Sequence, residues 1–124
     1  AYALEPSDYA AITSSAMGID VGEEEIMMMG KRLYNIEKAF NTIHAGFGRE
    51  DDLPPKRYMD EPVKSGPHKG AKCDREKFKI MLDEFYELNG WDGETGLQTR
   101  SGLMDLGLDD VAKKLEKAGK LIEK

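Results

Sequence analysis

Apolar residues recur over residues 23–46 at alternating steps of three and four, the spacing of one face of an α-helix. The members of this stripe are Ile26, Met29, Leu33, Ile36, Phe40 and Ile43. Three glutamates at the start suit the positive end of a helix dipole, and Gly46 suits a left-handed C-terminal cap. The pattern predicts a helix of about six turns whose apolar face packs into the core.

Three adjacent methionines, residues 27–29, lie near the start of this predicted helix. Neighbouring residues on a helix point in different directions, so the three thioethers cannot converge on one metal ion. Methionine is a flexible side chain that fills gaps between packed helices. The methionines are therefore interpreted as core residues.

A second apolar stripe predicts a helix over residues 74–88, with Asp74 as its N-cap and Asn89-Gly90 as its end. The members of this stripe are Phe78, Met81, Leu82, Phe85 and Leu88. The polar side of the same helix carries three carboxylates, Asp83, Glu84 and Glu87. Without a histidine or a buried setting, these carboxylates are interpreted as a solvated face rather than an acid–base or metal site.

Shorter signals predict three more helices. Ser7 or Asp8 is expected to cap the first, which ends at Gly18. Thr99 is expected to cap a helix that runs through Leu106, and Asp109 to cap the last helix. The lysine-rich segment that follows is expected to fray.

The remaining segments, approximately residues 46–73 and 90–98, are predicted to be long irregular loops because they are rich in Gly and Pro and lack periodicity. Trp91 is expected to be buried in a core or an interface, followed by at most a small hairpin over residues 93–97. No segment shows sustained alternation of apolar and polar residues. The sequence thus predicts an all-α fold, a compact bundle of about five helices in a single domain spanning residues 1–124.

Composition narrows the classes of function. The 24 acidic and 18 basic residues give a formal net charge of −6, which does not favour nucleic acid as a partner. The longest apolar run is four residues, far below the roughly 20 that span a bilayer, and no export signal is visible, so a cytoplasmic location is expected. A single cysteine, Cys73, cannot supply the four thiolates of an iron–sulfur cluster.

The common catalytic arrangements do not occur in this sequence. It has no phosphate-cradling Gly loop, no nucleophile beside a histidine and no pair of histidines at ligand spacing. His44, His68 and Cys73 are too scattered in sequence to favour a metal site. By itself the chain is therefore not expected to be an enzyme.

Four sequence segments together resemble a known family. They are GKRLYNIEKAFN (30–41), GFGREDDLPPKRYMDEPVKSGPHKG (46–70), MLDEFYELNGWDGETGLQT (81–99) and LGLDDVAKKLEK (106–117). In this order and spacing they are similar to the C-terminal end of the tungsten-containing aldehyde ferredoxin oxidoreductases, over roughly Gly22 to Lys117. The chain departs from the family at His44-Ala45, where an Arg-Glu pair is common.

The resemblance implies that the chain is a C-terminal fragment of a larger oxidoreductase. Such enzymes oxidise aldehydes to carboxylic acids and pass electrons from a tungsten–bis-pterin centre (tungstopterin, of the molybdopterin type) through a [4Fe–4S] cluster to ferredoxin. The cofactor-binding parts are expected to lie before Ala1, so no catalytic, cofactor-binding or metal-binding residue is assigned here. The fragment itself is expected to be inactive and to supply scaffold and interdomain packing.

One loop suits that packing role, because eight of the thirteen residues from Arg49 to Glu61 are charged and two prolines stiffen it. We expect this loop to dock on the cofactor-bearing remainder of the same polypeptide. The candidate docking residues are Asn41, Arg49, Asp51, Asp52 and Arg57. In the alternative, the loop is tied only to its own domain, with Asp51 and Asp52 capping the turn at Leu53-Pro54.

A second class of function also fits the composition. A free-standing acidic helical module that binds a protein partner, with no catalytic activity, has the same overall statistics as a single-domain fragment. The two classes differ in whether a cofactor-bearing segment belongs to the same polypeptide.

Overall fold

The computed structural model describes residues 4–124, and this part of the chain is built from helices joined by loops. Its elements are α1 (Pro6–Met17), α2 (Glu23–Ala45), the 3₁₀ helix η1 (Arg49–Asp52), α3 (Lys56–Asp60), α4 (Arg75–Asn89), α5 (Arg100–Asp105) and α6 (Asp109–Lys117). Within residues 4–124 the only β-structure is two isolated bridges, Trp91 with Gln98 and Thr99 with Ile122. The predicted all-α class is confirmed. The predicted loop over residues 46–73 additionally contains η1 and α3.

Most helix ends follow the local signals of the sequence. The Asp74 carboxylate accepts hydrogen bonds from the backbone N–H groups of Glu76 and Lys77, at 3.0 and 3.2 Å, and so caps α4. Thr99 caps α5 in the same way. Gly18, Gly46 and Gly90 end their helices in the left-handed conformation, as predicted.

Two predicted caps are wrong by a few residues. Glu5 is the N-cap of α1, and Asp8 instead lies at the third helical position, where its carboxylate accepts from the Glu5 N–H at 2.9 Å. Leu108 precedes α6, so Asp109 contributes negative charge to the first turn but no side-chain cap. Both helices nevertheless begin with a carboxylate near the positive end of the dipole.

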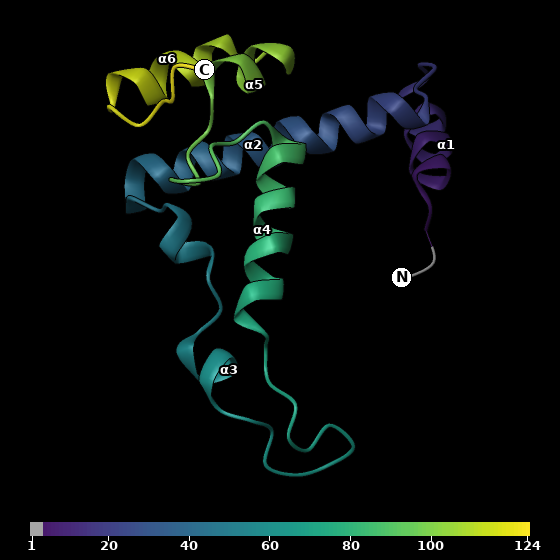
Figure 1. Cartoon of the computed structure of the whole chain (residues 1–124). Coiled ribbons are helices and arrows are strands. Elements are labelled where there is room, and N and C mark those ends of the chain that lie inside the picture. The colour runs from purple at the N-terminus through teal and green to yellow at the C-terminus, as the bar shows by residue number, and fades with distance from the viewer. Residues whose placement is uncertain (1–3) are drawn as a thin grey trace.

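The long helix α2 is the central element, and α1, α4, α5 and α6 are arranged along it (Figure 1). Helix α1 packs against its N-terminal half, and α5 and α6 lie across its C-terminal half. Helix α4 meets α2 at its own C-terminal end and projects away, towards α3 and the long loop that follows α3.

Two small cores hold this arrangement together. The first joins α2, α5 and α6 through Ala39, Leu103, Ala112 and Leu115. The second lies where α4 meets the following loop and contains Leu82, Tyr86 and Trp91. Trp91 is 6% exposed, which confirms its predicted burial.

The predicted core face of α2 is mostly uncovered, which corrects the prediction. Met29, Leu33, Ile36 and Phe40 are 47%, 60%, 46% and 62% exposed, and Met27 and Met28 are exposed as well. The residues that α2 buries instead are Asn35, Lys38, Ala39 and Thr42. These lie roughly 140° around the helix from the apolar stripe, at about 100° per residue.

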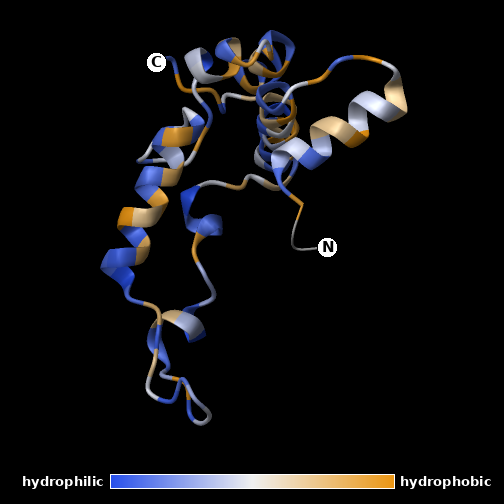
Figure 2. Cartoon of the chain, turned by 90° about the vertical axis from the view of Figure 1, so that its right-hand side faces the viewer, coloured by the Kyte–Doolittle hydropathy of each residue, from blue (hydrophilic) through white to orange (hydrophobic). Residues whose placement is uncertain are grey.

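The apolar stripe of α4 is covered only in part. Leu82 is buried and Phe78 half-buried, whereas Met81 and Leu88 are 56% and 76% exposed. Figure 2 shows apolar segments alternating with polar ones along α4 and α1. In this structure, α1, α2 and α4 therefore all present apolar side chains to solvent.

The lysine-rich end of the chain is ordered rather than frayed, which overturns that prediction. The backbone N–H of Ile122 donates to the Gln98 carbonyl at 3.1 Å, and the Arg100 N–H donates to the Ile122 carbonyl at 2.9 Å. Arg100 also pairs with Glu116 and Glu123. The last residues thus pack beside the loop that follows Trp91.

Candidate functional site

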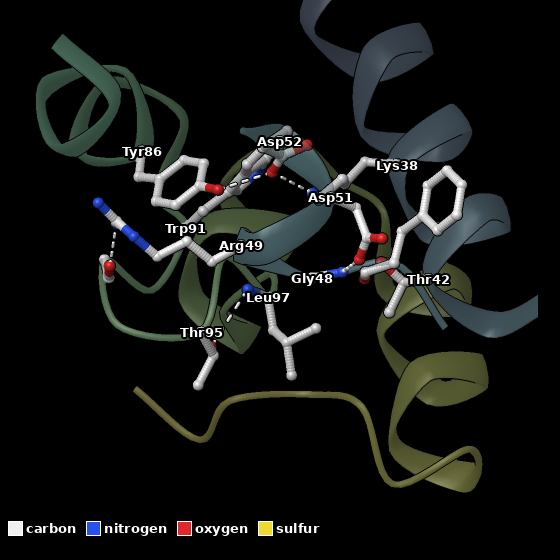
Figure 3. Close-up of polar contacts among 12 residues, drawn as sticks. Lys38, Thr42, Gly48, Arg49, Asp51, Asp52, Tyr86, Trp91, Thr95 and Leu97 are labelled. Carbon is white, nitrogen blue, oxygen red and sulfur yellow. Dashed lines mark hydrogen bonds and ion pairs between the residues drawn. The ribbon is translucent and has the colours of Figure 1, made fainter. Parts of the chain in front are cut away.

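The charged loop forms η1 and lies against the loop that follows Trp91 (Figure 3). The backbone N–H of Arg49 donates to the Thr95 carbonyl at 2.9 Å. Its guanidinium donates to Asp83 Oδ1 at 2.6 Å and to the Gly93 carbonyl, and lies 5.2 Å from the centre of the Tyr86 ring. Arg49 therefore joins η1 to both α4 and the loop of residues 91–99, the Trp91 loop.

Asp52 faces the opposite way, into the junction between α2 and α4. Its Oδ2 accepts hydrogen bonds from Lys38 Nζ at 2.8 Å and from the Tyr86 hydroxyl at 2.6 Å. Burial raises the pKa of Tyr86, and its hydrogen bond to the Asp52 carboxylate raises it further. Tyr86 is thus a neutral donor, and Asp52 is the counter-ion of a lysine whose side chain is 8% exposed.

The buried polar residues of α2 all have hydrogen-bond partners: Lys38 donates to Asp52, Thr42 donates to the Phe47 carbonyl, and Asn35 is bound by the loop that follows Trp91. The Trp91 indole N–H donates to Asn35 Oδ1 at 2.9 Å, and Gln98 Nε2 donates to the carbonyl and side-chain oxygens of Asn35 at 2.9 and 2.6 Å. The Lys38 ammonium lies 5.0 Å from the centre of the Trp91 ring, a cation–π contact. These bonds explain why a polar face of α2 is the buried one.

Asp92 joins the Trp91 loop to the end of the chain. Its carboxylate accepts from the N–H and hydroxyl of Thr95, at 2.9 and 2.8 Å, and from Lys124 Nζ at 2.5 Å. The hydrogen bond from Lys124 and those from Thr95 lower the pKa of Asp92 to about 2. The turn that holds Arg49 is therefore itself held by an ion pair.

The ion pair predicts a dependence of stability on pH. Because the pKa of Asp92 lies below its ordinary value of 3.8, its contribution is complete above pH 4 and is lost as pH falls towards 2. We expect Asp92→Asn to lower the unfolding free energy by about 1 to 2 kcal/mol at pH 6, and by less near pH 3. Urea unfolding of both proteins at the two pH values measures this, and a difference independent of pH would contradict it.

The structure brings three of the five candidate docking residues into one turn. Arg49 and Asp52 make the internal contacts described above, and Asp51 accepts from the Gly48 N–H at 2.9 Å. These contacts are those expected in the alternative, where the loop is tied to its own domain. Neither aspartate caps the turn at Leu53-Pro54, however, because Asp51 bonds to Gly48 and Asp52 to Lys38 and Tyr86.

The other two candidates lie apart from that turn. Arg57 is exposed on α3, 3.7 Å from Glu61, and Asn41 is exposed on α2. Asn41 lines a shallow hollow of about 380 Å³ together with Ile36, Glu37 and Phe40. Both side chains therefore remain accessible for contact with another surface.

Several residues from other elements that hold this turn or the neighbouring loop were not among the predicted site residues: Asn35, Lys38, Tyr86, Thr95 and Gln98. A signal for part of this set was visible, since Asn35, Lys38 and Thr42 recur at helical spacing on a second face of α2. Nothing local in the sequence indicates that this face meets Trp91.

Within residues 4–124, no group of three or more His, Cys, Asp or Glu side chains is placed to hold a metal ion. No helix described there is long and apolar enough to cross a membrane.

This chain is similar in sequence and in fold to known proteins. Residues 1–108 match the family model described as "Aldehyde ferredoxin oxidoreductase, domains 2 & 3". The tungsten-containing aldehyde ferredoxin oxidoreductase of Pyrococcus furiosus is 35% identical over 108 residues, which are 86% of this chain and 17% of that protein. The corresponding protein of Pyrococcus abyssi is 36% identical over 111 residues, 88% of this chain and 17% of its own.

More distant relatives share part of the sequence or the fold. The "Aliphatic sulfonate oxidoreductase, WOR-like subunit" of Pyrococcus furiosus is 35% identical over 72 residues, 58% of this chain and 11% of that protein. A solved structure, "Active site complex BamBC of Benzoyl Coenzyme A reductase in complex with 1,5 Dienoyl-CoA", superposes on 98% of this chain and 16% of its own, with a TM-score of 0.75 and 29% identity. The family match, these identities and the shared fold together show that this chain belongs to the aldehyde ferredoxin oxidoreductase family.

Proposed function

We propose that this chain is the C-terminal helical domain of a tungsten-containing oxidoreductase that converts an aldehyde to a carboxylic acid and passes the electrons to ferredoxin. In this proposal the domain supplies packing for the cofactor-bearing remainder of the same polypeptide. The length of the relatives supports it, since the matched region spans 17% of the tungsten-containing Pyrococcus protein.

The observation that carries the proposal is the uncovered apolar stripe of α2. Leu33 and Phe40 are 60% and 62% exposed, and they share a helix face with Met29 and Ile36. Contiguous apolar surface on a soluble domain marks a surface that binds another protein segment. A cofactor-bearing domain of the same polypeptide is the occupant that the family membership favours.

The donor groups of the described residues do not form a complete metal or iron–sulfur site. A [4Fe–4S] cluster requires four thiolates, and the sequence contains one cysteine, Cys73. Residues 4–124 present no cluster of His, Cys, Asp and Glu suited to a metal ion. The proposal therefore assigns tungstopterin and the cluster to the remainder of the polypeptide.

The five candidate docking residues divide into two roles in this proposal. Asn41 and Arg57 are exposed and would contact the adjoining domain directly, Asn41 beside Phe40 in the stripe. Arg49, Asp51 and Asp52 would act indirectly, because their contacts shape the end of α2 and the start of the loop. A surface with apolar anchors and a polar rim is typical of stable interfaces.

The double substitution Leu33→Asp with Phe40→Asp tests the proposed interface. In the full-length polypeptide, two carboxylates would be buried without partners, so we expect loss of most of the bound tungsten and of aldehyde-dependent viologen reduction. Metal analysis of the purified protein and the viologen assay measure this.

The matched control is the same double variant of the isolated 124-residue chain. Both positions are largely exposed there, so the unfolding free energy should change by no more than about 0.5 kcal/mol. A larger loss of unfolding free energy in the isolated variant would mean that the substitutions damage the domain itself. Wild-type tungsten content in the full-length variant would contradict the proposed interface.

The alternative of a free-standing interaction module makes a different prediction. An antibody raised against this chain would then detect a protein near 13.9 kDa in native extract of the source cells. The proposed oxidoreductase requires a band several times larger that contains tungsten and iron.

A further inference from the structure

The loop between α3 and α4 forms a projecting tip, residues 62–73, at the far end of α4 from α2 (Figures 1 and 2). Residues 60–72 are all exposed. The tip carries Lys64, His68, Lys69 and Lys72, and no carboxylate occurs between Glu61 and Asp74. It is therefore a positive feature on a chain whose formal net charge is −6.

The tip is held in a defined shape by its own backbone. The Val63 N–H donates to the Ala71 carbonyl and the Gly70 N–H to the Val63 carbonyl, both at 2.8 Å. The Cys73 N–H donates to the Tyr58 carbonyl at 3.1 Å, which ties the tip to α3. Because the loop is already ordered, binding through it requires little additional loss of conformational entropy.

The charges of the tip are separated from those of the body. Residues 62–73 contain three lysines and no acidic side chain, which leaves 15 basic and 24 acidic side chains in the rest of the chain. Helix α4, with 15 residues, is about 22 Å long at 1.5 Å per residue. That length exceeds the Debye length of about 8 Å at physiological salt, so acidic side chains at the far end of α4 are largely screened from the tip.

The tip also offers contact area beyond its charge. Tyr58 and Val63 are 66% and 46% exposed, and with Lys64 and Lys72 they line a hollow of about 590 Å³ between α3 and the tip. Lys64, Lys69 and Lys72 have no carboxylate within 4.0 Å among the described residues. The combination of unpaired lysines with an exposed aromatic and an aliphatic side chain is suited to a protein partner.

We propose that the tip is the docking surface for a compact acidic protein, the electron acceptor of the oxidoreductase; this inference rests on the proposed function. Such a partner is repelled by the acidic body and attracted by the tip, so the field orients it before contact. A nucleic acid strand fits less well, because a strand long enough to bind tightly would extend over the acidic body.

The test uses the full-length oxidoreductase and, as probe, a purified ferredoxin with an excess of Asp and Glu. The variant is Lys64→Glu, Lys69→Glu and Lys72→Glu. Its control is Lys113→Glu, Lys114→Glu and Lys117→Glu, which changes the net charge equally on exposed positions of α6. Biolayer interferometry at low and high salt gives Kd, and tungsten content and aldehyde-dependent viologen reduction report on the rest of the enzyme.

We expect the tip variant to raise the Kd for ferredoxin about tenfold or more at low salt and to flatten its salt dependence, with viologen reduction intact. The control variant should shift Kd less than about twofold. Unchanged affinity of the tip variant, or equal losses in both variants, would overturn the proposal. So would a tip variant that loses tungsten, since the tip would then pack against the same polypeptide. Absence of viologen reduction in the wild type would instead refute the proposed function.

Discussion

Replacing Gly96 by Ala should destabilise the domain by about 3 kcal/mol or more. Gly96 has a φ of 71°, in the left-handed region, and a Cβ there would lie 2.8 Å from the Tyr86 hydroxyl and 2.9 Å from the Arg49 backbone nitrogen. Both atoms already form hydrogen bonds, at 2.6 and 2.9 Å, so a shift of either would weaken the turn. Urea unfolding of the 124-residue chain measures the loss.

Gly93 supplies a matched control in the same turn. A Cβ at Gly93 would meet no atom within 4 Å, and its φ does not lie in the left-handed region. Gly93→Ala should therefore change the unfolding free energy by less than about 1 kcal/mol. Similar effects of the two substitutions would mean that the close approach of Gly96 to η1 does not govern stability.

Replacing Asp52 by Ala should lower the unfolding free energy by about 3 kcal/mol. The substitution removes the carboxylate from a lysine that is 8% exposed and leaves the hydroxyl of the fully buried Tyr86 without its acceptor. The effect should occur in the isolated chain, because both partners belong to it. Chemical denaturation of that chain is the measurement.

Asp51 and Lys38 supply the controls for this substitution. Asp51→Ala removes an exposed carboxylate that accepts only the Gly48 N–H among the described residues, so it should cost about 0.5 to 1 kcal/mol. Combining Asp52→Ala with Lys38→Met should recover part of the loss, since no buried charge then remains unpaired. If Asp52→Ala leaves the isolated chain unchanged but reduces tungsten retention in the full-length protein, the residue contributes by docking instead.

Local signals explain why the helices could be predicted. Asp74 and Thr99 cap α4 and α5 through bonds that span two or three residues, and Gly46 and Gly90 end their helices through a backbone conformation. Each of these signals depends on neighbours in sequence. For the same reason, the errors at α1 and α6 amount to a few residues and leave the helices themselves correct.

The sequence indicated that this charged turn matters, but it did not indicate which residues the turn contacts. Its density of charge drew attention to Arg49 and Asp52, yet their partners Asp83 and Tyr86 each lie 34 residues away in the sequence. A carboxylate beside a lysine and a carboxylate facing solvent have the same sequence signature. Only the meeting of α2, α4 and the Trp91 loop decides between them.

Local sequence patterns are enough to show that the chain is all-α, where most helices begin and end, and which family it resembles. Which face of α2 is buried depends on long-range packing, which buries Asn35 and Lys38 and leaves Leu33 and Phe40 exposed. The physical reason is that an amphipathic pattern records where apolar surface lies and not which surface will cover it. Burial of the polar face requires hydrogen-bond partners from Trp91, Gln98 and Asp52, which only the folded chain brings together.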